Sequence, residues 1–430
     1  MKAIRVSATL AVLLSISACG GESQRETHHG GATRSAAAPP VSYSGPAIPG
    51  LEQKPMWSMP NTAAVSTVGL GKTFAVVLGS QGASVTLLDA VTGKVVGAGR
   101  PLAQPTSETS NRRTPQLLRD MYRGGPVVVV RYTEHVAASG MQDEHDQDSD
   151  LVLDETGREV WRAPTSSDGG HYFVGGYAVD GHLNMSGGFV QGAGPYEGLP
   201  TDVTTITAVD GGRQVKVGGG ELGGNSEFVY AVRGTTAVET HQGELDPDGI
   251  EGLNLTTGKP AWTMKGVTFF GMFGDSVLTS KGDYKTESQQ LTFVDAASGR
   301  KIGSSRVPQF DCHVSVFDKD SGSALCASRR LGRSPLTVLD NTTATVRWKQ
   351  PSTNARDVLP TAAAGGVAYL VASESGTSGN QSHTYLAVND RNGQVLADNL
   401  PIDDITLADS GIALVSYQNT LYGFRMKKIV

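Results

Sequence analysis

Apolar and polar residues alternate in short runs along most of this chain, which is typical of β-strands that bury one face. Many of these runs belong to a longer unit: an apolar strand, an acidic or amide residue, a Thr-Gly turn and a second strand. Val85–Asp89 followed by Thr92 and Gly93 is one copy. The Asp or Asn can accept hydrogen bonds from backbone N–H groups of the turn, and Gly supplies a positive φ. Each unit therefore predicts a β-hairpin.

The acidic or amide position marks the period of a larger repeat. Its seven copies are Asp89, Asp154, Asp210, Asn254, Asp295, Asp340 and Asn389. The later intervals are 41 to 49 residues, and a four-stranded propeller blade uses about 40–50. Two further strands fit before each hairpin, as at Lys72–Leu78 and Gly366–Val371. In the sixth copy Ala344 replaces the glycine, so we expect a different turn there.

The two ends of the repeat array complement each other. Ile412–Ser416 and Thr420–Phe424 are expected to be two inner strands of one more blade that lacks its outer strand, and Lys54–Trp57 matches that missing strand. Pairing them would remove unpaired sheet edges, which favour aggregation. We therefore predict an all-β fold: an eight-bladed β-propeller of four-stranded antiparallel blades, closed by pairing of the N- and C-terminal strands.

All four tryptophans stand at one register of the repeat, four residues after the turn position that prefers glycine. They are Trp57, Trp161, Trp262 and Trp348. A large flat ring buries much apolar area at a low entropic cost. We expect these side chains to be structural, wedged between neighbouring blades, rather than to bind a ligand.

The pattern strand-Asp-x-x-Thr-Gly-Lys-x-x-Trp resembles the pyrroloquinoline-quinone-like repeat of eight-bladed propellers, over roughly residues 51–430. The family includes quinone-dependent dehydrogenases and also lipoproteins that scaffold the assembly of outer-membrane barrel proteins, so the resemblance leaves the function open. Several of the dehydrogenases hold their cofactor against a disulfide between adjacent cysteines, and this chain has no adjacent cysteines. The family's calcium ligands have no matching local motif either, so no cofactor is predicted.

The N-terminus has the pattern of an export signal. A basic start, Met1–Arg5, precedes an apolar run, Val6–Ile16, that is too short to be a permanent membrane span. Ile16–Cys19 resembles a bacterial lipoprotein processing site, which implies cleavage before Cys19 and lipidation of its thiol. An ordinary secretory signal with an incidental cysteine is the alternative. The resemblance implies an extracytoplasmic protein, lipid-anchored to the outer leaflet of the cell membrane or to the outer membrane.

Three segments follow from these patterns. Residues 1–18 are the predicted lipoprotein signal peptide, residues 19–50 a flexible tether and residues 51–430 the β-propeller. The tether is rich in Gly, Ser, Ala, Thr and Pro and has no hydrophobic period.

The remaining cysteines are predicted to form a disulfide. With Cys19 lipidated, Cys312 and Cys326 remain, and an even number of cysteines in an exported protein favours a disulfide over two free thiols. They flank the turn Asp318–Gly322, so we expect them to face each other across a hairpin of the sixth blade.

Charge and short motifs exclude some classes of function. The net charge is −6 with both signs mixed along the chain, which argues against nucleic-acid binding and against electrostatic attraction to anionic lipid. The sequence contains no His-Glu-x-x-His, Cys-x-x-Cys or Gly-x-Ser-x-Gly motif, so no catalytic residue is predicted. The alternating carboxylates Asp146, Asp148 and Asp150 are a candidate calcium site, and a solvated insertion between two strands is the alternative explanation.

Two classes of function remain. The first is a non-enzymatic binding or scaffold module, anchored by lipid, whose variable loops contact a protein or a small ligand. The candidate loops are 103–125, 137–150 and 183–203, which hold Tyr122, Phe189 and Tyr196, and aromatic residues are enriched at interfaces. The alternative is a quinone-dependent or other enzyme with its site in the propeller channel.

Overall fold

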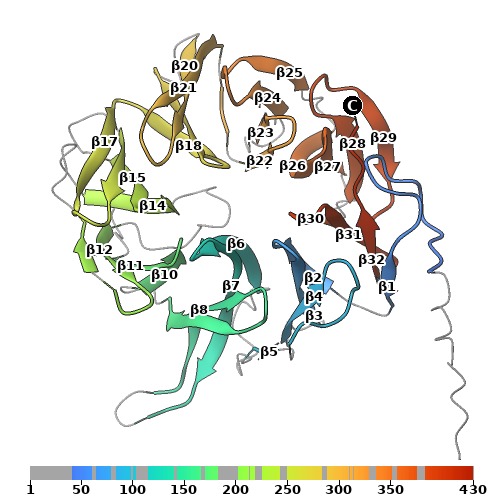
Figure 1. The fold of residues 1–430 in the computed structure, drawn as a ribbon, viewed down its shortest axis with the longest axis horizontal. Helices are drawn as coiled ribbons and strands as arrows, with labels where there is room; N and C mark the ends of the chain where they lie inside the picture. The colour runs from blue at the N-terminus through green and yellow to red at the C-terminus, as the bar shows by residue number, and fades with distance from the viewer. Residues whose placement is uncertain are drawn as a thin grey trace, which may run out of the picture. The chain divides into compact units, whose positions relative to one another are not determined.

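The alternating strands assemble into eight antiparallel blades around a central axis, a β-propeller, in a computed structural model of the chain (Figure 1). The structure describes residues 41–60, 64–78, 84–97, 100–102, 115–139, 143–165, 170–182, 202–212, 214–217, 225–242, 249–282, 288–308, 310–312, 314–328, 336–350, 356–374 and 383–429. These residues contain no helix, so none of them forms a helix that could cross a membrane.

The blades follow chain order, with the first strand of each nearest the axis. Blades 1 to 4 are β2 (Ala64–Gly69), β3 (Thr73–Leu78), β4 (Ser84–Asp89) and β5 (Arg100–Pro101); β6 (Gln116–Tyr122), β7 (Gly125–Val136), β8 (His145–Asp154) and β9 (Glu159–Pro164); β10 (Gly170–Val174), β11 (Tyr177–His182), β12 (Asp202–Ala208) and β13 (Gln214–Lys216); β14 (Asn225–Arg233), β15 (Thr236–Gln242), β16 (Gly249–Asn254) and β17 (Lys259–Lys265).

The remaining blades repeat this order, and the last one is shared between the two ends of the chain. Blades 5 to 8 are β18 (Thr268–Phe273), β19 (Ser276–Lys281), β20 (Gln289–Asp295) and β21 (Lys301–Val307); β22 (Val314–Asp318), β23 (Ser323–Ala327), β24 (Leu336–Asp340) and β25 (Val346–Gln350); β26 (Arg356–Ala364), β27 (Val367–Glu374), β28 (His383–Asn389) and β29 (Val395–Leu400); β30 (Asp404–Ala408), β31 (Ile412–Tyr417), β32 (Thr420–Arg425) and β1 (Trp57–Met59).

The predicted closure of the ring is confirmed. β1 pairs antiparallel with β32, and Ser58 lies opposite Tyr422. The two predicted inner strands, β31 and β32, are instead the middle strands of blade 8, and β30 is the innermost. β30 has only five residues and begins with Asp404, so its apolar pattern is short.

The core lies between the blades. One cluster joins Leu87 of blade 1 to Val128 and Leu151 of blade 2, and another joins Leu325 of blade 6 to Leu370 of blade 7. Middle strands are buried on both faces because a blade on each side covers them; the burial of β3 is nearly continuous from Thr73 to Val77. Burial of apolar area between blades is thus the main force that holds the ring together.

The repeated turn has the geometry that its sequence predicts. In blade 1, Asp89 Oδ1 accepts hydrogen bonds from the backbone N and the Oγ1 of Thr92, both at 2.7 Å. Gly93 has φ +68° and donates its N–H to the carbonyl of Asp89 at 2.8 Å. The expectation of a different turn at Ala344 was wrong: its φ is +60°, and its N–H donates to the carbonyl of Asp340, also at 2.8 Å.

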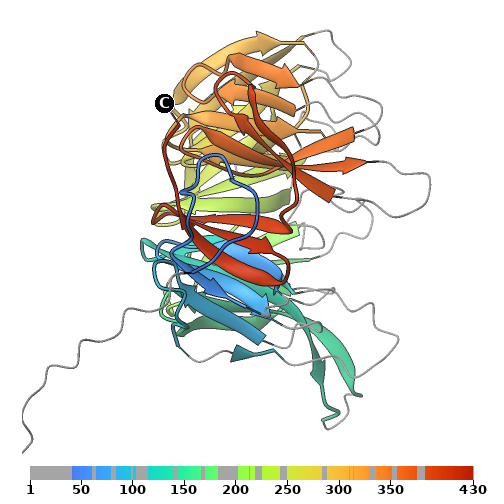
Figure 2. The ribbon, with the colours of Figure 1, turned by 90° about the vertical axis from the view of Figure 1, so that its right-hand side faces the viewer.

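The two faces of the ring carry different connections (Figure 2). Because successive strands of a blade run in opposite directions, the first-to-second and third-to-fourth turns lie on one face. These turns are short; for example, only Arg123 and Gly124 separate β6 from β7. We call this the turn face. The connections from second to third strand, and from one blade to the next, leave the opposite face, which we call the loop face.

Residues 41–51 pack against blades 7 and 8, although residues 41–50 belong to the predicted tether. The ring of Tyr43 meets those of Tyr422 and Phe424 edge-on, with centroids 5.0 Å apart in each pair. Tyr369 donates its hydroxyl to the carbonyl of Pro49 at 2.7 Å. Contacts of the chain with the ring therefore begin before β1.

Candidate functional site

A cavity of about 1510 Å³ lies at the centre of the ring, where the first strands of the blades and the turns that follow them converge. Its lining combines apolar side chains such as Met272 and Phe317 with charged ones from the turn face. In propellers the central channel collects one short segment from every blade, so residues far apart in sequence become neighbours. The cavity is therefore the first place to look for a site.

Three arginines at this cavity form ion pairs with aspartates of other blades. Arg123 of blade 2 lies 2.8 Å from Asp210 of blade 3, and Arg233 of blade 4 lies 2.9 Å from Asp275 of blade 5. Arg119 makes a two-pronged contact with Asp409 of blade 8, with Nη1 donating to Oδ1 at 2.9 Å. These pairs are largely solvent-exposed, so each contributes little stability.

Asp120 on β6 is the most perturbed acid of the cavity. Burial raises the pKa of its carboxyl to about 6, although hydrogen bonds from the backbone N–H groups of Gly175 and Met121 act in the opposite direction. Gly175 belongs to the turn of blade 3, so Asp120 also joins two blades. Sequence patterns did not single out Asp120 or the three arginines, because their partners in other blades lie 42 to 290 residues away in the chain.

Of the three candidate binding residues, the structure describes Tyr122. Tyr122 ends β6 and lines the cavity on the turn face, where the Arg123 guanidinium carbon lies 5.3 Å from its ring centroid. Residues 116–122 are thus a strand within the predicted loop 103–125. Phe189 and Tyr196 lie outside the described residues, as does Cys19.

The three alternating aspartates lie on β8 and contact β7 in a ladder. Asp150 accepts from Nε of Arg131 at 2.9 Å, Asp148 accepts from Oγ1 of Thr133 at 2.7 Å, and Asp146 lies 3.2 Å from Nδ1 of His135. The expectation of a solvated insertion was wrong for residues 145–150, because each carboxylate finds a cross-strand partner and β8 continues through them. Within the described part of the chain, no group of three or more His, Cys, Asp or Glu could hold a metal ion.

Three of the tryptophans bind the turn of the following blade. Trp57, Trp262 and Trp348 donate their indole N–H to the carbonyls of Ala90, Ala296 and Asp390 at 2.8, 3.2 and 2.7 Å. Each carbonyl comes directly after the acidic or amide residue of the repeat. The glycine of the same turn lies against the ring; a Cβ on Gly93 would meet Trp57 at 2.5 Å. Trp161 packs against Phe173 of the next blade, with centroids 5.9 Å apart.

The disulfide prediction is confirmed. Cys312 and Cys326 are bonded, with Cα atoms 4.9 Å apart. Cys326 lies on β23, and Cys312 precedes β22 by two residues, so the bridge fixes the start of blade 6. Both residues are buried in the core.

Comparison with known proteins assigns no function to this chain. No family model and no curated protein matches this chain. Among solved structures, it is similar to a chain of the mitotic checkpoint complex, with 11% identity, 90% of this chain and 100% of that chain covered, and a TM-score of 0.39. It is also similar to the C-terminal WD40 domain of Sif2, with 10% identity, 87% and 98% covered, and a TM-score of 0.43. Likeness at this level says nothing about a ligand or partner.

Proposed function

We propose that this chain is an extracytoplasmic lipoprotein whose β-propeller is a non-enzymatic binding or scaffold module. The observation that carries the proposal is the difference between the two faces of the ring. At the central cavity, three arginines form ion pairs with aspartates in the short turns of other blades. Residues 102–115 and 183–201 are the longest connections, and the strand ends that they join lie on the loop face. Variable loops on a rigid scaffold are a common place for binding.

The resemblance of the repeat to pyrroloquinoline-quinone-like lipoproteins supports the same proposal. Lipidation at Cys19, followed by a polar tether, would keep the ring near a membrane and still allow it to reach a partner. A flexible chain of about 20 residues spans roughly 25 Å on average. The partner would be a protein or a small ligand at the loop face, with the lipid as the only link to the membrane.

Chemical cross-linking in native membranes tests the contact surface. We expect wild-type protein to capture a defined partner, and a variant with residues 183–201 replaced by a short Gly-Ser linker to lose it. A matched variant with residues 375–382 replaced, on the same face in blade 7, should keep it. Unchanged capture by the first variant would contradict the loop surface.

Two further readouts address the anchor and the absence of catalysis. The Cys19→Ala variant should move from the membrane fraction to the soluble fraction, and retention of that variant in the membrane would contradict the lipid anchor.

Reconstitution with pyrroloquinoline quinone and calcium should give no dye-linked oxidation above background. Activity in that assay would favour an enzyme with its site in the central cavity.

A further inference from the structure

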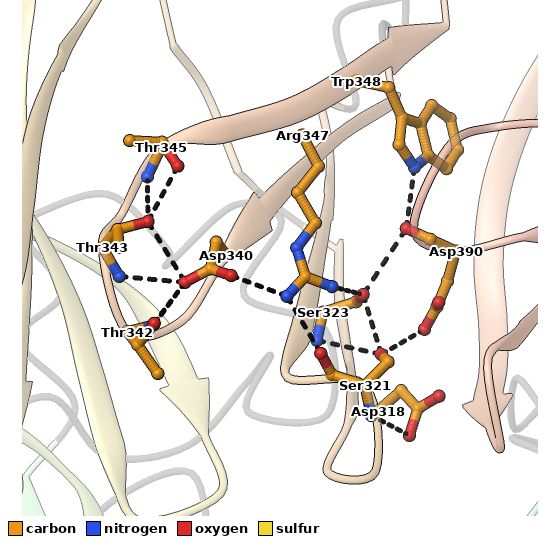
Figure 3. Close-up of polar contacts among 10 residues, drawn as sticks. All are labelled: Asp318, Ser321, Ser323, Asp340, Thr342, Thr343, Thr345, Arg347, Trp348 and Asp390. Carbon is orange, nitrogen blue, oxygen red and sulfur yellow. Dashed lines mark hydrogen bonds and ion pairs between the residues drawn. The ribbon is translucent and has the colours of Figure 1, made fainter. Parts of the chain in front are cut away.

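Two aspartates are buried together at the boundary between blades 6 and 7 (Figure 3). Asp318 ends β22, and Asp390 follows β28; their exposed fractions are 1% and 0%. A carboxylate removed from water is costly unless hydrogen bonds or an opposite charge compensate it. The contacts of the two carboxyl groups therefore indicate which of them carries the charge.

Asp318 is surrounded by hydrogen-bond donors. Its Oδ1 accepts from the backbone N–H groups of Asp320 at 2.8 Å and Ser321 at 3.4 Å, and its Oδ2 accepts from the N–H of Gly366 at 2.8 Å. Gly366 lies in the turn of blade 7, so this carboxylate also joins the two blades. Several backbone N–H donors stabilise a negative charge on Asp318.

Asp390 has the opposite environment. Its Oδ2 accepts from Oγ of Ser321 at 2.5 Å, and its buried Oδ1 has no hydrogen-bond partner among the described residues. The two carboxyl groups are neighbours, because Ser321 donates to both of them and Gly366, which donates its N–H to Asp318, accepts the backbone N–H of Asp390 at 3.1 Å. Two ionised carboxylates would repel each other there, whereas a protonated Asp390 can donate a hydrogen bond to Asp318.

The charged groups nearby are engaged elsewhere. From β25, Arg347 donates to Oγ of Ser323 at 2.6 Å, to the carbonyl of Ser321 at 2.9 Å and to Asp340 at 2.6 Å. Lys428 of the C-terminal tail lies 3.5 Å from Asp320. Lys319 and Arg391, the remaining charged residues of the two turns, form no ion pair with either carboxyl among the described residues. No cation therefore offsets a second negative charge at this position.

We propose that Asp318 and Asp390 share one proton, and that this proton makes the joint between blades 6 and 7 tighter in mildly acidic medium than in alkaline medium. The joint is coupled to the repeat itself, because the carbonyl of Asp390 accepts the indole N–H of Trp348 at 2.7 Å. Movement of Asp390 on ionisation would thus be transmitted to the tryptophan that holds blade 6 to blade 7.

The direction of the pH effect follows from the pKa of Asp390. Burial, together with the neighbouring charge of Asp318, raises this pKa from its ordinary value of 3.8 to about 6. The folded protein therefore holds a proton that the unfolded chain releases. The resulting contribution to stability is fully present below pH 3.8 and is lost as the pH rises through about 6.

Thermal unfolding of wild type and Asp390→Asn between pH 4.5 and 8 tests the shared proton. The amide of the variant can donate to Asp318 at every pH and cannot ionise. We expect similar midpoints near pH 4.5 and a midpoint higher by roughly 3 °C or more in the variant at pH 8. A variant that is destabilised equally at all pH values would overturn the proposal.

A second measurement needs no variant. The indole N–H resonance of Trp348 in tryptophan-labelled wild-type protein should shift with a midpoint near pH 6, and a resonance that does not move across this range would contradict the shared proton.

A metal ion bound at Asp390 Oδ1 is the alternative to the shared proton. If calcium raised the midpoint of the wild type at pH 8 and EDTA lowered it, with no effect on Asp390→Asn, a cation rather than a proton would hold the joint.

Discussion

Replacement of Trp57 by alanine is expected to lower the free energy of unfolding by about 3–5 kcal/mol, the usual cost of removing a large buried aromatic side chain. The ring of Trp57 is 6% exposed and packs with Phe74, Leu88 and Leu414, which belong to blades 1 and 8. Because β1 has only three residues, this side chain provides much of the contact that closes the ring. Urea unfolding followed by circular dichroism measures the loss.

Two control variants separate burial from the hydrogen bond. Trp57→Phe keeps most of the apolar contact but leaves the carbonyl of Ala90 without its donor, which should cost about 1–3 kcal/mol. Trp161→Ala removes a tryptophan that is only partly buried, so a smaller loss than that of Trp57→Ala is expected. Equal losses at Trp57 and Trp161 would contradict a special role for the closing blade.

Removal of the disulfide has the second largest expected effect. Cys312 and Cys326 are 14 residues apart, and opening a loop of this size lowers stability by about 3 kcal/mol in the chain-entropy model. We expect the Cys312→Ala/Cys326→Ala variant to unfold at a lower urea concentration than the oxidised wild type. Reductant should lower the midpoint of the wild type and leave that of the variant unchanged. Coincident unfolding curves for the oxidised wild type and the variant would show that the bridge contributes nothing.

The parts of the fold that depend on local sequence could be predicted well. The hairpin turn is one such part, because Asp89, Thr92 and Gly93 make its hydrogen bonds within five residues of chain. The same chemistry explains why Ala344 keeps the turn: Asp340 accepts from Thr342 and Thr343 and fixes the backbone without a glycine.

The tryptophans could be placed between blades from the repeat, but the individual hydrogen-bond partners across blade boundaries could not be predicted in this way. The carboxyl of Asp120 binds the backbone of Gly175, and the acceptor of the Trp348 indole N–H is the backbone carbonyl of Asp390, so neither contact depends strongly on a side chain at the other position. The cross-strand ladder of β7 and β8 was missed for a related reason. Its acidic residues have the composition of a loop, and only the partners on the facing strand, such as Arg131, make them part of a sheet.

Closure of the ring by the N-terminal strand is the claim on which the rest depends, and a cysteine cross-link tests it directly. Ser58 of β1 lies opposite Tyr422 of β32. In a Cys19→Ala background, the Ser58→Cys/Tyr422→Cys variant should form an intramolecular disulfide on mild oxidation, identified by mass spectrometry of the joined peptides. A matched Ser58→Cys/Thr207→Cys variant, with its second cysteine in blade 3, should form none. If both variants fold and Ser58→Cys fails to bridge to Tyr422→Cys, the ring is not closed in this way.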